Sequence, residues 1–191
     1  MQPLSKQPIP EQAKKVFSGV IFDVYQWDQE MFDGTTQVFE KLRRSNTAVV
    51  IPITAAGTIL MIEEEQPMKK VFHGFPGGRI ETGEETLSAA QRELKEETGY
   101  EGEDWELIEA MQPVTKIDWT IFTFVARNCR KVAEQSLDGG EKVTLKEVSF
   151  EEFLEIALLE DFRMTHLQLQ AMEAKYNSEK KEELRQMLFG N

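Results

Sequence analysis

The chain has 191 residues, of which 40% are hydrophobic and 29% are charged. Its 34 acidic and 22 basic side chains give a net charge of −12, which argues against a nucleic-acid partner or an anionic membrane surface, because both are bound through basic side chains. The single cysteine excludes an intrachain disulfide and a zinc site built on thiolates. Because its apolar runs are also too short to cross a bilayer, we expect one main soluble, cytoplasmic domain.

The N-terminal part of the chain predicts a loose arm followed by an antiparallel β segment. Residues 1–12 contain three prolines and show little periodicity. β-Branched and aromatic residues then favour strands over residues 16–25 and 36–42, with a polar turn around Asp33 and Gly34 between them. We expect these two strands to pair as a hairpin.

The rest of the chain predicts strands interrupted by single helices. Helical spacing is clearest over residues 85–98, where Gly99 is placed to end the helix. The other expected elements are strands at residues 48–53, 58–63, 71–75, 105–111, 119–126 and 142–148, and helices at residues 150–159, 165–175 and 178–188. This mixed order indicates a layered α/β or α+β domain.

Three glutamates of the expected helix share one face. Glu93, Glu96 and Glu97 are spaced i, i+3 and i+4, so their like charges repel one another unless a cation lies between them. Carboxylate oxygens are hard ligands, which suit Mg²⁺ or Mn²⁺ better than zinc or copper. Taken alone, the same three residues also fit an ordinary solvated helix face.

The residues around these glutamates favour a rigid site. Arg92 lies one turn from Glu96 and can orient its carboxylate. Ahead of the helix, the paired glycines of residues 75–78 let a backbone carbonyl approach a metal or a phosphate. The apolar side chains expected to hold the helix against the core are Leu87, Ala90 and Leu94.

The spacing of residues 78–100 resembles the Nudix box. The pattern is G-x5-E-x7-R-E-U-x-E-E-x-G-U, where U is apolar, and every required residue is present. Seven fixed positions coincide by chance on the order of once per ten million starting points. The matching residues are Gly78, Glu84, Arg92, Glu93, Leu94, Glu96, Glu97, Gly99 and Tyr100.

The resemblance implies an α/β/α sandwich with a mixed sheet, preceded here by the N-terminal antiparallel β segment. Nudix proteins hydrolyse a nucleoside diphosphate linked to another moiety, using bound Mg²⁺ or Mn²⁺. Carried over by position, Glu84 and Arg92 would hold the loop and the helix in register, and Gly78 would lie beside the substrate. The implied metal ligands are Glu93, Glu96, Glu97 and the carbonyl of Gly77.

The resemblance extends over residues 15–175 and points to the ADP-ribose pyrophosphatase-like branch. Its members begin with an antiparallel segment that commonly helps to build a dimer in which both subunits line each site, which implies a homodimer here. Phe39 and Arg44 match the positions of an aromatic residue that stacks on adenine and a basic residue that holds the phosphate or the ribose. Strand packing and a surface charge are the alternatives for these two residues.

In this branch the catalytic base can come from a mobile loop just before a late strand. Residues 138–141 read Asp-Gly-Gly-Glu and precede the expected strand at 142–148, and the two glycines would permit movement. The position implies Glu141 as the base, with Glu134 as the other candidate. An exposed loop glutamate without a catalytic role is the alternative.

Two departures from the branch concern the substrate. Gln66 is followed by Pro67 and Met68 where an arginine is usual, which leaves Lys69 or Lys70 to substitute for it. The usual Ser-Pro-Gly turn downstream reads Gln-Pro-Val over residues 112–114. Nearby, Trp119 could stack on a base or a sugar of the substrate, with plain packing as the alternative.

The expected organisation is an arm and β-hairpin that dimerises over residues 1–45, a Nudix domain over residues 46–177 and a C-terminal helix over residues 178–191. We expect metal-dependent hydrolysis of ADP-ribose or a related nucleoside diphosphate sugar to a nucleoside monophosphate and a sugar phosphate. One alternative is the same chemistry on GDP-mannose, a dinucleoside polyphosphate or a damaged nucleotide. Another is a module that senses a nucleotide without cleaving it.

Overall fold

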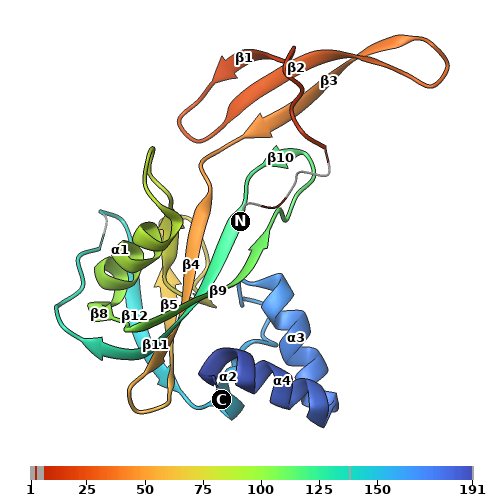
Figure 1. The fold of residues 1–191 in the computed structure, drawn as a ribbon. Coiled ribbons are helices and arrows are strands. Elements are labelled where there is room, and N and C mark those ends of the chain that lie inside the picture. Colours follow the sequence, from red (N-terminus) through yellow and green to blue (C-terminus); the bar gives the residue numbers. More distant parts are fainter. Residues whose placement is uncertain (1–2, 4–6, 138, 191) are drawn as a thin grey trace.

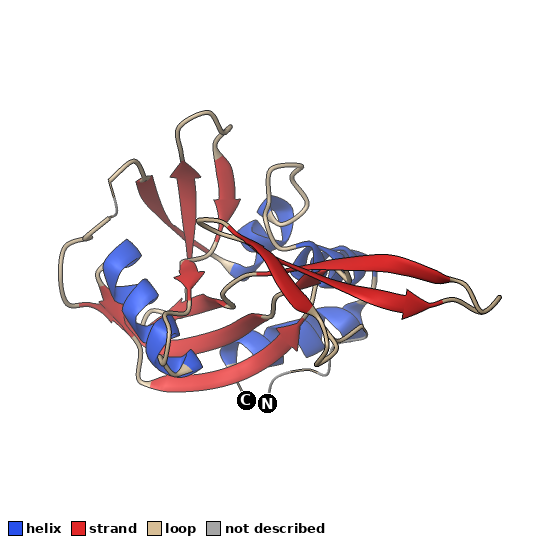
Figure 2. Cartoon of the chain, turned by 90° about the horizontal axis from the view of Figure 1, so that it is seen from above, coloured by secondary structure: helices blue, strands red, loops and turns tan. Residues whose placement is uncertain are grey.

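The N-terminal strands form a small sheet that stands apart from the rest of the protein. The computed structural model describes residues 3, 7–137 and 139–190, so part of the expected arm lies outside the described residues. The strands of this sheet are β1 (Lys14–Ser18), β2 (Asp23–Glu30), β3 (Thr36–Arg43) and β10 (Ile117–Asp118). Their order is β1-β2-β3-β10, and all pairs are antiparallel except the parallel pair β3 and β10. The β2–β3 hairpin extends beyond the other elements in both views (Figures 1 and 2).

The single strand expected over residues 16–25 is wrong, because the chain turns in its middle to form β1 and β2. The Gly19 N–H donates to the Phe22 carbonyl at 2.9 Å and closes this turn. A Cβ at Gly19 would lie 2.9 Å from the ring of Phe17 and 3.1 Å from the Phe22 carbonyl oxygen, so a side chain there would displace its neighbours in the turn. Ser-Gly is a turn signal, which the apolar residues on both sides obscured. The expected pairing with the following strand is confirmed as β2 against β3.

The central sheet is mixed and follows the order β12-β5-β4-β11-β8, with β6, β7 and β9 at its margins. β4 and β11 are parallel, whereas β5 is antiparallel to both β4 and β12. Its strands are β4 (Thr47–Thr54), β5 (Ile59–Glu65), β6 (Phe72–Gly74), β7 (Gly77–Arg79), β8 (Tyr100–Glu101), β9 (Asp104–Met111), β11 (Ile121–Lys131) and β12 (Lys142–Val148). β4 reads as a continuous apolar run because it is central and covered on both faces.

Helices cover both faces of this sheet, as Figure 1 shows. The helices are α1 (Thr86–Thr98), α2 (Phe150–Ile156), α3 (Thr165–Tyr176) and α4 (Ser178–Phe189). One hydrophobic cluster joins α1 to β4 and β11, and a larger cluster joins α2, α3 and α4 to β4 and β5. The expected α/β/α sandwich with a mixed sheet and an N-terminal antiparallel segment is therefore confirmed. No helix in the described part of the chain has the length and apolar character needed to span a membrane.

The helix that carries the three glutamates is held against the sheet by small side chains. Ala89, Ala90 and Leu94 are fully buried against β4 and β11. Leu87 does not hold the helix as expected, since it is 38% exposed. Gly99 ends the helix as expected, with a left-handed φ of 74° and its N–H bound to the Lys95 carbonyl. Alanine allows the helix to approach the sheet closely, which fixes the position of the glutamates beside it.

Candidate active site

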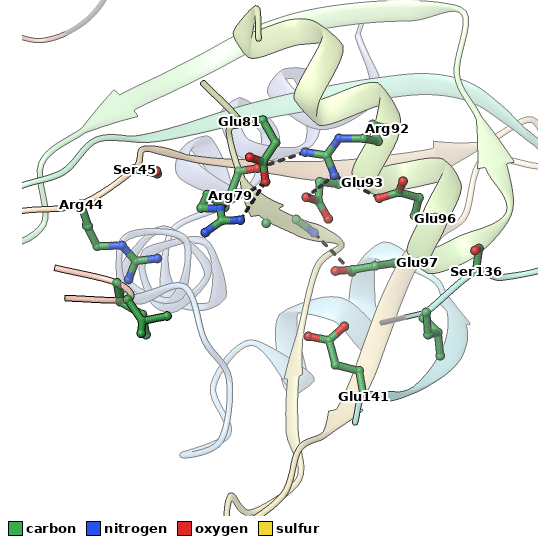
Figure 3. Close-up of a pocket in the computed structure, with 15 residues that line it drawn as sticks. Arg44, Ser45, Arg79, Glu81, Arg92, Glu93, Glu96, Glu97, Ser136 and Glu141 are labelled. Atoms are coloured by element: carbon green, nitrogen blue, oxygen red, sulfur yellow. Dashed lines mark hydrogen bonds and ion pairs between the residues drawn. The ribbon is translucent and has the colours of Figure 1, made fainter. Parts of the chain in front are cut away.

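A pocket of about 350 Å³ lies between α1, β7, the end of β3 and the loop before β12 (Figure 3). Glutamates from α1 line one side, and Glu141 from the loop lies next to Glu97. Arg44 and Arg79 line the other side, where Glu81 pairs with Arg79. We call the side with the α1 glutamates and Glu141 the acidic half of the pocket, and the side with the two arginines the basic half.

Two glycines of β7 bring the backbone against the carboxylates of α1. A Cβ at Gly78 would collide with the carboxylate of Glu93, and a Cβ at Gly77 would collide with the backbone of β4. The Gly77 N–H also donates to Oε2 of Glu97 at 3.3 Å. The structure thus explains both glycines by the close approach of β7 to α1 and β4. The approach of a backbone carbonyl to a metal or a phosphate, which the sequence suggested, stays a prediction.

Arg92 connects the acidic side chains to the loop before the helix. Its guanidinium donates to both oxygens of Glu84 at 3.0 and 3.1 Å, to Glu93 at 2.7 Å and to Glu96 at 3.0 Å. A further N–H reaches the Arg79 carbonyl at 3.0 Å. The hydrogen bond from Arg92 lowers the pKa of Glu84, and Oε2 of Glu84 also accepts the Glu81 N–H at 2.9 Å. The structure places Glu84 and Arg92 where they hold loop and helix together.

Glu97 occupies an environment that disfavours its negative charge. Burial raises the pKa of Glu97 to about 9, with further contributions from the charges of Glu93, Glu64 and Glu141. Burial also raises the pKa of Glu93, although Arg92 opposes this shift. Carboxyls held so close to their protonated form need a cation before they can all be ionised together.

The donor set fits a divalent metal ion by its chemistry. Three carboxylates on one face of α1 offer the oxygen ligands that Mg²⁺ and Mn²⁺ prefer. The backbone group of Gly77 that contacts them is its N–H, which binds Glu97. Among residues 7–137 and 139–190, no three His, Cys, Asp or Glu side chains are already close enough together to hold an ion. In this arrangement Arg92 binds two of the three carboxylates, at Glu93 and Glu96.

The two candidates for the catalytic base lie in different surroundings. Glu141 lines the pocket, and Nε2 of Gln66 lies 3.4 Å from its Oε1. Glu134 is exposed at the surface, where it pairs with Lys131 at 3.1 Å, and it does not line the pocket. Asp138, which begins the expected mobile loop, lies outside the described residues. The geometry therefore favours Glu141 over Glu134.

Arg44 lies at the basic side of the pocket and is held by aromatic side chains. Its guanidinium lies 4.6 Å from the Trp119 ring and 5.8 Å from the Phe22 ring. Its buried Nε has no hydrogen-bond partner among the described residues. Burial and the charge of Arg79 lower the pKa of Arg44. An anion in the pocket would supply the missing partner.

Trp119 and Phe39 are placed differently from what the sequence suggested. Trp119 packs against Arg44 and donates its indole N–H to Thr47 at 3.0 Å, so it supports the arginine without lining the pocket. Phe39 packs against Trp27 and Lys116 at a separate hollow on β3. Within one chain, Phe39 therefore does not line the pocket that holds the glutamates. Its ring lies against Trp27 instead.

Sequence reasoning missed Arg79 as a pocket residue. It falls among the unspecified positions of the motif, so a basic residue directly after the paired glycines was its sole signal. In the structure Arg79 lines the pocket and donates to Glu81 at 2.9 Å in an exposed pair. The lysines expected to replace the usual arginine are absent from the pocket lining: Lys69 binds the side chain of Gln66, and Lys70 is exposed.

Comparison with known proteins agrees with this fold. The NUDIX domain model matches residues 43–169. The ADP-ribose pyrophosphatase of Bacillus subtilis (strain 168) is 30% identical, over 82% of this chain and 85% of its own. The methanol dehydrogenase activator of Bacillus methanolicus is 34% identical, over 75% of this chain and 79% of its own. A crystal structure of an ADP compounds hydrolase matches with a TM-score of 0.65 and 20% identity, over 92% of this chain and 99% of its own.

Proposed function

The chain belongs to the Nudix family, and we propose that it is a metal-dependent enzyme that hydrolyses the pyrophosphate bond of ADP-ribose or a related nucleoside diphosphate sugar. The family match and the relatives confirm the expected Nudix pyrophosphohydrolase of the ADP-ribose pyrophosphatase-like branch. The observation that carries the proposed substrate class is the division of the pocket into an acidic and a basic half. A diphosphate is the ligand that needs both halves, since its oxygens bind both cations and guanidinium groups.

Each side of the pocket has a distinct task in this proposal. Glu93, Glu96, Glu97 and the Gly77 carbonyl would hold Mg²⁺ or Mn²⁺, which when bound neutralises phosphate oxygens and lowers the pKa of a water molecule. Arg92 holds two of these carboxylates in place through the ion pairs described above. On the other side, Arg44 and Arg79 bind the substrate's phosphate oxygens.

Glu141 acts as the general base in this proposal. Its carboxylate accepts a proton from the attacking water, whose oxygen bonds to one phosphorus while the bond from that phosphorus to the bridging oxygen breaks. The products are a nucleoside monophosphate and a sugar phosphate. The support for Glu141 is its position in the pocket next to Glu97, on the loop between β11 and β12.

We also propose that two copies of the chain associate through the N-terminal sheet. Phe17, Val20 and Val38 are 60%, 98% and 66% exposed in the single chain. Large exposed apolar side chains gathered on one element mark protein interfaces. A second copy is the occupant that fits, because Val20 and Ile21 of the same sheet reach the pocket rim and the branch commonly dimerises there. In such a dimer, Phe39 of one subunit could line the pocket of the other subunit.

A substrate panel tests the proposed reaction. ADP-ribose, GDP-mannose, a dinucleoside polyphosphate and an oxidised nucleoside triphosphate would be incubated with the protein and Mg²⁺ or Mn²⁺, and the products identified. We expect the fastest turnover for ADP-ribose or another nucleoside diphosphate sugar, with activity abolished by EDTA. Fast turnover of a different compound, with ADP-ribose left intact, would contradict the proposed substrate. It would still agree with pyrophosphate hydrolysis as the reaction.

The relative named methanol dehydrogenase activator favours a second candidate, an activator of another enzyme. A module that binds a nucleotide without cleaving it would serve that role as well as an enzyme would. The Glu97→Gln variant separates the two, since activation that survives the loss of hydrolysis would favour a sensing module. Parallel loss of hydrolysis and activation would favour an activator that works through catalysis.

A further inference from the structure

The loop between β11 and β12 is attached to the C-terminal end of α1. The Val132 and Ala133 N–H groups donate to the Gly99 carbonyl at 2.8 and 3.1 Å. The Ser136 N–H donates to the Glu96 carbonyl at 2.8 Å. Carbonyls in the last turn of a helix have no partner within the helix, so the loop satisfies groups that the helix leaves open. The same loop then continues to Glu141.

Gly99 makes this close attachment possible. Besides its left-handed φ, a Cβ at this position would collide with the Ala133 carbonyl and lie 2.9 Å from its carbon. A side chain there would therefore push the loop away from the helix. Gly99 thus both ends the helix and leaves room for the loop that begins 33 residues later, at Val132.

A single side chain then joins this helix end to the strand after the loop. Nε2 of Gln135 donates to the Glu97 carbonyl at 2.6 Å and to the Val143 carbonyl at 3.2 Å. Glu97 is a proposed metal ligand, and Val143 follows Glu141 by two residues on β12. The two donors of one planar amide therefore tie together the backbone segments that carry Glu97 and Glu141.

β12 begins directly after Glu141, where Lys142 and Val143 pair with Glu65 and Glu64 of β5. Just before Glu141, a Cβ at Gly139 would meet nothing within 4 Å, and Gly140 has a φ of 114°. Oε1 of Glu141 also lies 3.4 Å from Nε2 of Gln66. The bonds of Gln135 are 2.6 and 3.2 Å long, and the second one reaches the strand two residues after Glu141.

We propose that Gln135 is a positioning residue that keeps Glu141 next to Glu97 in the pocket. The inference rests on the proposed role of Glu141 as the general base. Misplacement of a reacting group by about 1 Å can cost on the order of 100-fold in rate. Loss of the Gln135 bonds should therefore lower kcat, while KM and the affinity for Mg²⁺ stay close to their original values. Gln135 binds the backbone carbonyl of Glu97 and no carboxylate or guanidinium of the pocket, and α1 stays packed on the sheet through its buried alanines and Leu94.

The sharpest test is Gln135→Glu, which keeps the size of the side chain and removes its N–H donors. We expect kcat to fall about 10- to 100-fold. Gln168→Glu is a matched control, since Gln168 also donates its amide to a backbone carbonyl, that of Leu159 at 3.0 Å, far from the pocket. The control should leave kcat unchanged. Gln135→Ala provides a second, uncharged variant if the first does not fold.

A double-mutant cycle with Glu141→Gln then tests the route of the effect. If Gln135 acts by placing Glu141, Gln135→Ala should cost little once Glu141 has already lost its basicity. Equal losses of kcat in both backgrounds, or a rise in the Mg²⁺ concentration needed for half-maximal rate, would overturn the positioning role. Full activity in Gln135→Ala beside a strongly impaired Glu141→Gln would overturn it too. Full activity in Glu141→Gln would instead overturn the proposed base.

Discussion

The helix side of the pocket and its N-terminal side are held in opposite ways. On the helix side, α1 is packed on the sheet by buried alanines, and Arg92 ties its carboxylates to the preceding loop. The N-terminal sheet projects from the molecule and exposes Phe17 and Val38, yet it leads to Arg44 at the pocket. The carboxylates of the helix side are therefore held in place by contacts within one chain. The N-terminal side of the pocket depends instead on a sheet whose apolar side chains are exposed in the single chain.

The largest effect is expected at the helix side, from Glu97→Gln. The amide has no charge with which to hold a divalent cation, so kcat should fall at least about 1000-fold while the fold persists. Steady-state hydrolysis with product identification measures this loss. Glu101→Gln is the matched control, because Glu101 is an exposed glutamate paired with Lys95 outside the pocket. A Glu97→Gln variant with wild-type kcat would contradict the assignment of the metal ligands.

The next largest effect is expected at the N-terminal sheet. Replacing Phe17 with serine and Val38 with lysine removes exposed apolar side chains that the proposed dimer would bury, and should raise the dimer's Kd about 100-fold or more. Light scattering over a dilution series measures the change. Tyr176→Ser is the control, since Tyr176 is an exposed aromatic residue on α3. A wild-type protein that is monomeric at all concentrations would contradict the proposed dimer.

A smaller effect is expected at the basic half of the pocket. Arg79→Ala removes one of the two guanidinium groups proposed to bind phosphate oxygens, so KM should rise about tenfold with a smaller change in kcat. Lys70→Ala is the control, because Lys70 is exposed and absent from the pocket lining. If Lys70→Ala raised KM and Arg79→Ala did not, the lysine would be the substitute for the arginine that the branch usually has.

The smallest effect concerns the stability of the metal-free protein. Burial raises the pKa of Glu97 to about 9 in the folded state, whereas an unfolded glutamate titrates near about 4.3. The folded protein thus keeps a proton that the unfolded chain releases, and this contribution to stability is complete below pH ~4.3 and decreases as the pH rises toward 9. In EDTA, Tm should therefore fall between pH 5 and pH 8, by up to about 3–5 °C per pH unit through this group.

Glu97→Gln sharpens this test because it removes the titrating group. The variant should lose much of the pH dependence of Tm, whereas Glu101→Gln should keep the wild-type slope. Thermal unfolding followed by circular dichroism at several pH values measures both. Identical slopes in all three proteins would mean that Glu97 is ionised in the folded, metal-free state.

Part of the candidate site was accessible from the sequence because its geometry is local. The three glutamates share a face because helical spacing places positions i, i+3 and i+4 together. The role of Gly99 as a helix end and the link between Arg92 and Glu96 follow from the same short range. Glu141 was found through a resemblance to a family, with no physical signal of its own, and the structure then brought it into the pocket.

Other features needed the folded chain. The turn at Gly19 lies inside an apolar run, where the local pattern for a strand outweighed one Ser-Gly step. Phe39 looked like a pocket residue by position, but the twist and pairing of β3 direct it toward Trp27. Arg79 occupies a variable position of the motif. Its proposed role in binding phosphate depends on the nearby Arg44, which lies 35 residues earlier in the chain.

The sequence by itself determined the family chemistry, since a helix turn and the glycines before it place their side chains through contacts between near neighbours. The tertiary structure alone decided what faces those side chains: the two arginines opposite the carboxylates, and the amide of Gln135 bound to a backbone carbonyl 38 residues away. Contacts at such separations depend on how the strands are ordered in the sheet, and no periodicity within a short segment records that order.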